Sequence, residues 1–197
     1  MSYELLIGLI AFAFVTSITP GPNNLMLMAS GVNFGFRRSI PHMLGVGFGF
    51  MFMVIIVGAG LMQVFEAHPV SYNLLKVASV TYLLYLAWKI AHAAPPEGAQ
   101  EAGTPITFFQ AALFQWVNPK AWAMALTAIS VYSPTQTLEK IALVAFVFGV
   151  INLPSVSTWT ILGQQMRRVL TNPVRLRSFN VGMALLLVAS LYPVLFL

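Results

Sequence analysis

The sequence predicts an all-α integral membrane protein with six transmembrane helices, arranged as two inverted three-helix repeats. The 197-residue chain is 58% hydrophobic and only 8% charged, whereas about 25% of the residues in a soluble domain carry a charge. Its mean hydropathy is +0.82. The apolar residues also fall into six runs, each at least as long as the roughly 20 residues that a helix needs to cross a bilayer.

The connectors between the apolar runs hold most of the charge and turn residues, as in FGFRRS, EAHPVS and RRVLTNPVRLR. The longest connector, about 94–104, lies near the middle of the chain and is low in hydrophobicity. We therefore expect one transmembrane domain over residues 1–197, with a first repeat at about 1–93 and a second at about 105–197. The six runs cover about 4–32, 40–66, 70–92, 105–131, 138–165 and 175–197.

Lysine and arginine lie unevenly along the chain, which predicts its orientation. Arg37 and Arg38 follow the first run, Lys89 closes the third, and four arginines surround the turn from the fifth to the sixth. The other connectors contain little beyond Lys140 and Lys76. Because cytoplasmic loops are rich in Lys and Arg, we expect the connections after the first, third and fifth helices to be cytoplasmic. Both termini should then lie outside.

The composition excludes several classes of function. The chain has no cysteine, which excludes disulfides, iron–sulfur clusters and thiolate metal sites. The formal net charge of +5 does not indicate nucleic-acid binding, because the basic residues lie mostly at the ends of apolar runs. The sequence offers no nucleophile with a base, no paired acids and no cluster of metal ligands. We therefore expect neither an enzyme nor a bound cofactor or metal.

Helix-breaking residues interrupt the first apolar run at TPGPNN, residues 19–24. Proline lacks a backbone donor and clashes with the preceding turn, so Pro20, Gly21 and Pro22 should split this helix. A new half-helix should begin near Pro22 or Asn23. In hydrocarbon each freed backbone group costs several kcal/mol, so a break persists only where it is buried in protein or lines a cavity. The alternative is a simple proline kink.

A second break is predicted at the corresponding place in the other half of the chain. TPGPNNLMLMA (residues 19–29) aligns without gaps on NPKAWAMALTA (residues 118–128), which places Pro20 on Pro119. Both prolines lie near the centre of the first helix of their half. With three helices in each half, the two halves enter the membrane in opposite directions, so this echo predicts an inverted repeat.

Other polar residues in the apolar runs are further candidates for the site at the breaks. Gln115 precedes the second break, and Asn152 lies near the middle of the fifth run. Instead of binding substrate, Asn152 could link two helices through a hydrogen bond. Residues 45–49, which include three glycines, indicate close helix packing. The chain has no aspartate, and its five glutamates fall near helix ends or in loops. No carboxylate at the membrane centre is therefore available to bind a cationic cargo.

Each break exposes a half-helix N-terminus at mid-membrane, where free N–H groups and the helix dipole attract a carboxylate. In inverted halves these two N-termini should face each other. Lys120 lies beside the second one, and a lysine at membrane depth indicates function, with snorkelling to the interface as the alternative. The predicted substrate-binding residues are Pro20, Gly21, Pro22, Asn23, Asn24, Gln115, Asn118, Pro119, Lys120 and Asn152.

The motifs resemble those of the LysE/RhtB family of amino-acid exporters. The shared features are TPGPN, the following GFRRS with a glycine-rich second helix, YLLYLAWKIA in the third helix and FQWVNPKAW in the fourth. The resemblance covers essentially the whole chain and is greatest to the cysteine/O-acetylserine exporter branch. It implies efflux from the bacterial cytoplasm without ATP hydrolysis. Family members that export lysine and arginine carry an aspartate in helix 2, near residues 45–49 of this chain, so its absence favours a neutral cargo.

The breaks and the resemblance together predict a secondary transporter that exports small neutral amino acids or close derivatives, such as cysteine or O-acetylserine, by alternating access. It should lie in the bacterial inner membrane with both termini periplasmic. Its partners should be the amino acid and the lipid bilayer, and its small-residue faces would suit a homodimer. The alternatives are a non-transporting scaffold or assembly protein, a membrane-embedded enzyme, and an exporter of another class of amino acid.

Overall fold

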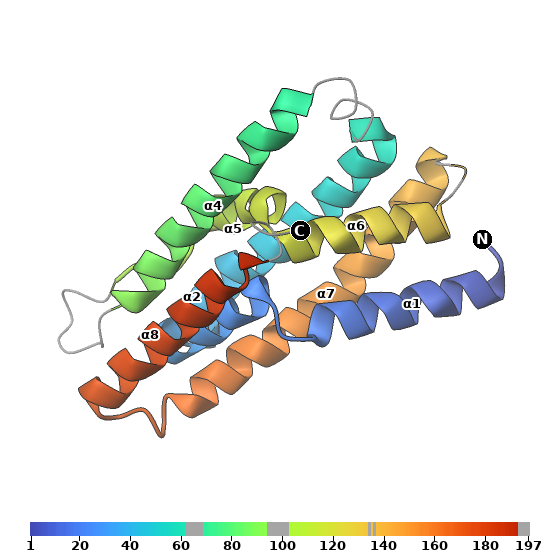
Figure 1. Ribbon diagram of the computed structural model, residues 1–197. Coiled ribbons are helices and arrows are strands. Elements are labelled where there is room, and N and C mark those ends of the chain that lie inside the picture. Colours follow the sequence, from blue (N-terminus) through green and yellow to red (C-terminus); the bar gives the residue numbers. More distant parts are fainter. Residues whose placement is uncertain (62–68, 94–102, 134, 136, 193–197) are drawn as a thin grey trace.

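Every regular element is a helix in the part of the chain that the computed structural model describes, residues 1–61, 69–93, 103–133, 135 and 137–192. The predicted all-α class is confirmed. Most of the linker predicted at about 94–104 lies outside the described residues. In chain order the elements are α1 (Tyr3–Ile18), α2 (Pro22–Ile56), the π-helical η1 (Val57–Leu61), α4 (Pro69–Ala91), α5 (Phe108–Phe114), the 3-10 turn η2 (Gln115–Val117), α6 (Pro119–Tyr132), α7 (Leu138–Met166) and α8 (Pro173–Ala189) (Figure 1).

The first predicted span is interrupted where its prolines lie. α1 ends at Ile18, and α2 begins at Pro22. Thr19 and Gly21 both have extended backbone conformations. Pro22 occupies the first turn of α2, where its missing N–H removes no helical hydrogen bond and its fixed φ suits the helix. The two prolines therefore separate two half-helices instead of bending one.

The prediction of a connecting loop between the first two spans is wrong. Instead of a loop near residues 33–39, the chain turns at Gly35, whose φ of 76° and ψ of 173° are non-helical. Helix resumes on the next residue, so α2 consists of a half-helix (residues 22–34) followed by a second helix (residues 36–56). Only glycine adopts such a positive φ without strain, which explains how one residue can reverse the chain here.

The fourth predicted span is divided in the same way. α5 begins with a capping box between Thr107 and Gln110, and η2 ends before Asn118, whose backbone is extended. α6 then starts at Pro119. Pro22 and Pro119 thus hold the same position in their half-helices, which corrects the ungapped alignment that paired Pro20 with Pro119. The second residues of the two half-helices are Asn23 and Lys120.

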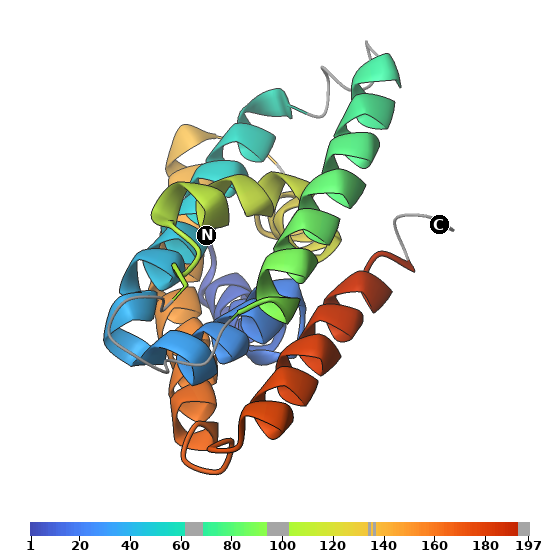
Figure 2. The same cartoon turned by 90° about the vertical axis from the view of Figure 1, so that its left-hand side faces the viewer.

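The helices of the two halves pack against each other in matching pairs. α1 packs on α7 while α5 packs on α2, and α4 lies beside α8 (Figure 2). The close packing predicted for the glycines of residues 45–49 is confirmed, since a Cβ added to Gly49 would lie 2.6 Å from Ala112 Cα and one at Gly45 would collide with Phe108 O. These glycines therefore allow close packing between helices of the same chain.

Large apolar side chains cover much of the outer surface. Phe14, Phe52, Trp88, Phe109 and Phe146 are all more than half exposed. Two described stretches are long and apolar enough to cross a membrane by themselves, 22–61 and 138–166. The breaks divide the first and fourth predicted spans into shorter helices, and the end of the sixth lies outside the described residues. The exterior is that expected of a helical membrane protein.

Candidate functional site

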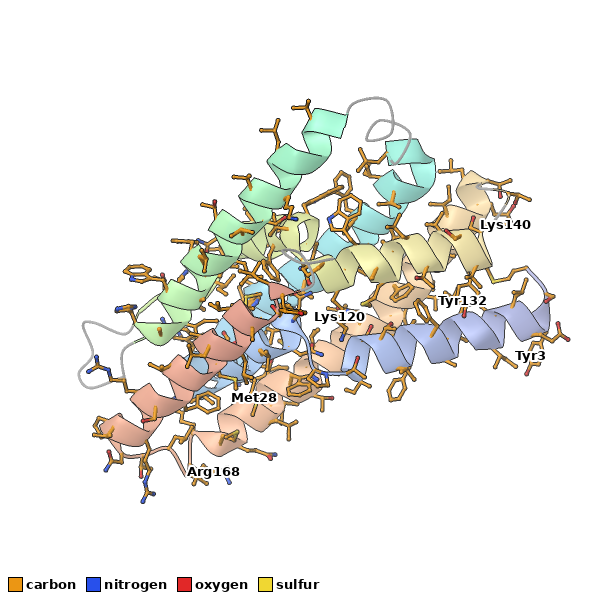
Figure 3. The ribbon with its side chains drawn as sticks, viewed as in Figure 1. Tyr3, Met28, Lys120, Tyr132, Lys140 and Arg168 are labelled. Atoms are coloured by element: carbon orange, nitrogen blue, oxygen red, sulfur yellow. The ribbon has the colours of Figure 1, made fainter. Side chains whose placement is uncertain are left out.

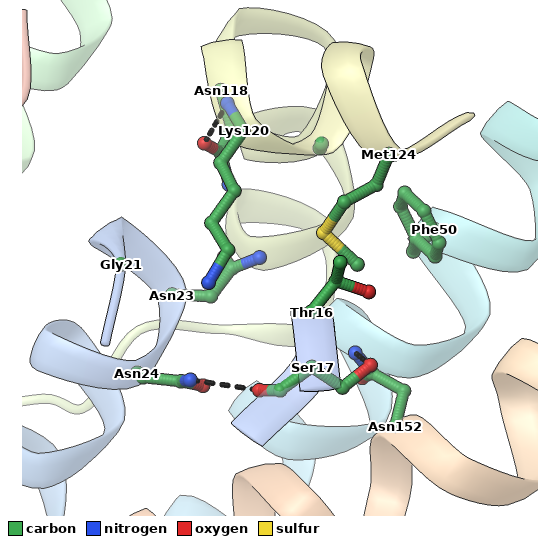
Figure 4. A pocket seen from close by; sticks show the side chains of 11 residues that line it. Thr16, Ser17, Gly21, Asn23, Asn24, Phe50, Asn118, Lys120, Met124 and Asn152 are labelled. Atoms are coloured by element: carbon green, nitrogen blue, oxygen red, sulfur yellow. Dashed lines mark hydrogen bonds between the residues drawn. The ribbon is translucent and has the colours of Figure 1, made fainter. Parts of the chain in front are cut away.

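A small pocket lies where the two helix interruptions meet (Figure 4). Figure 3 places Lys120 near the centre of the molecule, far from the helix ends marked by Tyr3, Lys140 and Arg168. The pocket is bounded by α1, α2, α6 and α7, so both halves of the chain build it. The side chains and glycine that line it are Thr16, Ser17, Gly21, Asn23, Asn24, Phe50, Asn118, Lys120, Ala121, Met124 and Asn152.

Lys120 reaches from the first turn of α6 to the break in the other half. Its Nζ donates to Thr19 O at 2.7 Å and to Thr19 Oγ1 at 2.8 Å, with Pro20 O farther away at 3.4 Å. All three acceptors are neutral, so the charge of the lysine is solvated without being neutralised. The sequence had suggested a lysine that faces the opposite half-helix, but not that the carbonyl groups of the break would hold it.

The N-terminus of α2 lies directly against this lysine. A Cβ added to Gly21 would lie 2.7 Å from Lys120 Cδ and 3.1 Å from Lys120 Nζ, so glycine is what allows the two segments to approach. No side chain caps the N-terminus of α2. The positive end of a helix dipole and an ammonium group therefore share one wall of the pocket, and that wall favours an anion.

Asn23 makes the equivalent crossing in the opposite direction. Its Nδ2 donates to Gln115 Oε1 at 2.8 Å, and Gln115 Nε2 donates back to Asn23 Oδ1 at 3.1 Å. Asn23 and Lys120 are each the second residue of a half-helix, and each bonds to the segment that precedes the break in the other half. These reciprocal links explain how two interruptions far apart in the sequence are held together.

Two asparagines serve mainly to stabilise the breaks. Asn24 Nδ2 donates to Ser17 O and Thr19 O, both at 2.8 Å, and so satisfies carbonyl groups at the end of α1. Asn118 Oδ1 accepts from the backbone N of Lys120 at 3.1 Å, which caps α6. The N-terminus of α6 is thus already occupied by its own side chain, whereas that of α2 is open.

Asn152 forms the opposite wall of the pocket from α7. Its Nδ2 donates to Ser17 Oγ at 3.4 Å, while its Oδ1 is buried and has no hydrogen-bond partner among the described residues. The side chain is only 6% exposed. A buried amide oxygen without a donor costs about 1–3 kcal/mol, so this position can accept a hydrogen bond from a ligand.

No carboxylate lies near the pocket in the described part of the chain. The two glutamates it contains, Glu4 and Glu139, are in the first turns of α1 and α7. Nor do the described residues contain a group of three His, Cys, Asp or Glu side chains that could hold a metal ion. The pocket therefore offers one cationic wall and one neutral acceptor wall.

Comparison with known proteins identifies the family. The family model described as LysE type translocator matches residues 14–190. The chain belongs to the LysE translocator family. The resemblance inferred from TPGPN and NPKAW is thereby confirmed, and transport of a solute is the activity for which the family is named.

Curated members of the LysE family match over nearly the whole chain. Cysteine/O-acetylserine efflux proteins from Escherichia coli strain K12, Escherichia coli O9:H4 strain HS and Shigella sonnei strain Ss046 are each 30% identical over 190 residues. These alignments cover 95% of this chain and 96% of each relative. No solved structure matches the chain.

The predicted site residues of this LysE-family chain fall into two groups. Gly21, Asn23, Asn24, Asn118, Lys120 and Asn152 line the pocket. The other four lie beside it: Pro22 and Pro119 begin the half-helices, Pro20 contributes a carbonyl, and Gln115 holds Asn23.

Sequence reasoning missed the contribution of α1 and of the second helix. Thr16 and Ser17 line the pocket just before the break, and Phe50 lines it from α2. Hydroxyl groups in the last turn of an apolar helix are a weak signal, since they commonly bond to their own backbone, as Thr16 Oγ1 does to Phe12 O at 2.6 Å. Nothing in the sequence around Phe50 distinguishes it from its apolar neighbours.

Proposed function

We propose that this LysE-family chain is a secondary transporter that exports small neutral amino acids, or close derivatives such as cysteine and O-acetylserine, from the bacterial cytoplasm. One observation carries the proposal: the pocket has an ammonium group among neutral oxygens at one wall and, at another, a buried amide oxygen that has no hydrogen-bond partner among the described residues. A zwitterion carries the complementary pair, a carboxylate and an ammonium group on the same carbon.

The carboxylate of the cargo would bind between Lys120 and the open N-terminus of α2. Thr19 O and Oγ1 now accept from Lys120, and a carboxylate would replace these neutral acceptors with a charged one, so that both partners of the bond are ionised. The helix N-terminus adds further N–H groups. This binding would detach Lys120 from the break, so cargo would change the contact between the two halves of the chain.

The ammonium group of the cargo would bind at the neutral wall. Asn152 Oδ1 has no donor among the described residues, and Ser17 Oγ, which accepts from Asn152 Nδ2 at 3.4 Å, is a second neutral acceptor at this wall. The N–H donors of the ammonium group could satisfy the buried acceptor, and its positive charge is balanced by the carboxylate of the same cargo molecule. The proposed pocket therefore selects the charge pattern of the cargo more than the shape of its side chain.

Alternating access would follow from movement of α1 against α6. Tyr132 donates its hydroxyl to Gly8 O at 3.1 Å, and its ring centroid lies 5.9 Å from that of Phe12. These contacts hold α1 against α6 along the part of α1 that precedes the pocket. We propose that separating α1 from α6 releases the cargo on the side of the chain's N-terminus.

The pairing of helices supports two inverted repeats of three helices each, with six spans in total. Exchanging the halves converts the α1–α7 contact into the α5–α2 contact and leaves the α4–α8 pair in place. The crossing bonds of Asn23 and Lys120 exchange in the same way. Such a relation is expected when breaks at mid-membrane in the first helix of each repeat form a shared binding site.

The proposed location is the inner membrane, with both termini in the periplasm. The donor Phe36 N lies 2.6 Å from Gln164 Oε1, and Arg38 Nη2 donates to Gly103 O, so the arginine-bearing turns gather at one end of the molecule. Lys140 is at the other end of α7. The end rich in arginine would face the cytoplasm.

Topology can be tested with a reporter enzyme that is active only in the periplasm. A fusion after Leu197 should be active, because an even number of spans returns the chain to the side from which it started. A matched fusion of the same reporter within the connection between α7 and α8, after Leu170, should be inactive. Activity at Leu170 with none at the C-terminus would contradict the proposed orientation.

The choice of cargo rests on the charge of the pocket and on the relatives. The matched curated relatives are named as efflux proteins for cysteine and O-acetylserine, both small neutral amino acids. A homodimer stays a proposal, since the glycines of α2 that would suit one face α5 and α7 within the chain.

Counterflow in proteoliposomes tests the proposed function against a scaffold and an enzyme. Vesicles loaded with unlabelled O-acetylserine should take up external labelled O-acetylserine transiently above its equilibrium level, because a carrier exchanges cargo across the membrane. A scaffold would give no overshoot, and an enzyme would convert the label into another compound. Either of those results in vesicles that contain folded protein would reject the transporter proposal.

A further inference from the structure

A second cavity lies along the later turns of the half-helix that begins at Pro22. Its walls are residues 26–34 of α2, the last turns of α4 and residues 103–106. It shares no lining residue with the pocket at the breaks. Most of its lining is apolar, and its polar side chains include Ser30, Asn33, Lys89 and Thr104.

Lys89 is the cation of this cavity, and its partners are weak. Its Nζ donates to Pro105 O and to Gln110 Oε1, each at 3.3 Å. Hydrogen bonds from an ammonium group to a charged oxygen are usually about 2.7–2.9 Å long, and an ammonium group has three donors. Lys89 thus has two long bonds to neutral oxygens, and the described residues provide no carboxylate for it.

The other described residues at the cavity are neutral or basic. Arg38 Nη2 donates to Gly103 O at 3.3 Å beside the cavity. Asn33 is held by reciprocal bonds with Asn180 of 2.8 and 3.0 Å, and Asn180 also donates to Ala93 O at 3.2 Å. This buried amide pair fixes the half-helix relative to α4 and α8. Among the described residues, the positive charge of the cavity therefore has no anionic partner, and the amide pair holds one of the walls in place.

One short segment connects this cavity to the pocket at the breaks. Gln110 of α5 bonds to Lys89, and Gln115 of η2 bonds to Asn23. Both cavities border the same half-helix of α2. The half-helix thus has the Lys120 pocket at its first turn, where Asn23 lies, and the Lys89 cavity along its later turns.

We infer that the Lys89 cavity is a second carboxylate site, which binds the amino-acid cargo on the arginine-rich side before the cargo reaches Lys120. The inference rests on the proposed function, because the cargo is taken from it. A lipid phosphate is the other source of an anion. The cargo is favoured because Lys89 is half-buried and bonds towards α5, whereas its neighbour Trp88 is 59% exposed on the outer surface.

The absence of cysteine from the chain makes a site-specific test practical. Thr104 is exposed and lines the cavity, so the maleimide labelling rate of a Thr104→Cys variant reports on its occupancy. A Ser178→Cys variant, exposed on α8 and outside the cavity, is the matched control. Both would be measured in phosphatidylcholine vesicles, with and without O-acetylserine.

O-acetylserine should slow the labelling of Thr104→Cys and leave that of Ser178→Cys unchanged. Adding Lys89→Gln should raise the half-protecting concentration about tenfold, as expected for loss of a charge-assisted hydrogen bond, and Lys89→Arg should restore much of the protection. Adding Lys120→Gln should leave the protection intact. Equal protection with and without Lys89, or none at all, would overturn the inference.

Two further outcomes distinguish this inference from a lipid-binding site and from the proposed transport function. If phosphatidylglycerol in the vesicles protects Thr104→Cys in a Lys89-dependent manner and O-acetylserine does not, the site binds a lipid headgroup and the cargo assignment is overturned. If O-acetylserine protects Thr104→Cys but counterflow is absent, the proposed transport fails while the carboxylate site stands.

Discussion

Replacing Lys120 with alanine should reduce export of O-acetylserine to the background rate while the protein stays inserted and folded. Lys120 is the cation that lines the pocket, and the acceptors of its Nζ among the described residues are neutral oxygens of the opposite break. Removing a charged hydrogen-bond partner costs about 1.5–3 kcal/mol, or roughly 10- to 100-fold in affinity. The variant also loses the link between the halves that cargo is proposed to release. Counterflow in proteoliposomes measures the loss.

The matched control for this variant is Lys140→Ala. Lys140 is at the start of α7, where its Nζ donates to Thr135 Oγ1 at 2.9 Å, far from the pocket. This control should export normally. Size-exclusion profiles of both variants in detergent would show whether they fold. Near-normal export by a folded Lys120→Ala variant would remove Lys120 from the proposed site.

Lysine and arginine should be rejected as cargo by a large factor. The pocket already holds one ammonium group and the positive end of α2, and the described residues place no carboxylate at its walls. A basic side chain would bring a second positive charge into a partly buried site, where an unpaired charge costs several kcal/mol. A neutral side chain has no such cost. An excess of unlabelled lysine should therefore fail to compete with labelled O-acetylserine in counterflow.

A charge introduced near the neutral wall should relax this selection. A Cβ added to Gly47 would lie 4.0 Å from Asn152 Oδ1 and 2.9 Å from Leu153 Cδ2, so Gly47→Asp would bring a carboxylate towards the ammonium end after Leu153 shifts. Competition by lysine should increase in this variant, whereas the matched Gly47→Asn variant should still exclude lysine. Efficient lysine export by the unmodified chain would contradict this explanation of the pocket.

The two helix interruptions could be predicted because they depend on local chemistry. A proline removes one hydrogen bond and fixes one φ wherever it occurs, so TPGPN and NPK identify the ends of half-helices without tertiary information. Which prolines correspond could not be predicted. The alignment matched letters and chose Pro20, but the geometry depends on the first helical position, and Pro22 holds it.

The turn between the first two helices shows what the sequence could not predict. The residues around Gly35 were predicted to form a connector because they contain Arg37 and Arg38. The charges do mark a turn, but one glycine with a φ of 76° makes it. Sequence patterns identify a glycine that could adopt this conformation, but the contacts of the completed fold select the one that does.

The candidate site could be predicted only in outline. Lys120, Asn23 and Asn152 are unusual in apolar runs, so each was identified from its polarity alone. Their partners could not be, because Thr19, Gln115 and Ser17 lie about 90 to 135 residues away in the chain and only packing of the halves brings them together. The same holds for Asn180, whose pairing with Asn33 has no local signature.

The central claim is that the carboxylate of the cargo binds at Lys120 and the N-terminus of α2. The most direct measurement compares counterflow of O-acetylserine with that of its carboxamide, which keeps the ammonium group and side chain but lacks the anion. The unmodified chain should transport O-acetylserine and should neither transport the carboxamide nor be inhibited by it. Transport of both compounds at similar rates would contradict the claim, because the positive wall of the pocket would then have no part in recognition.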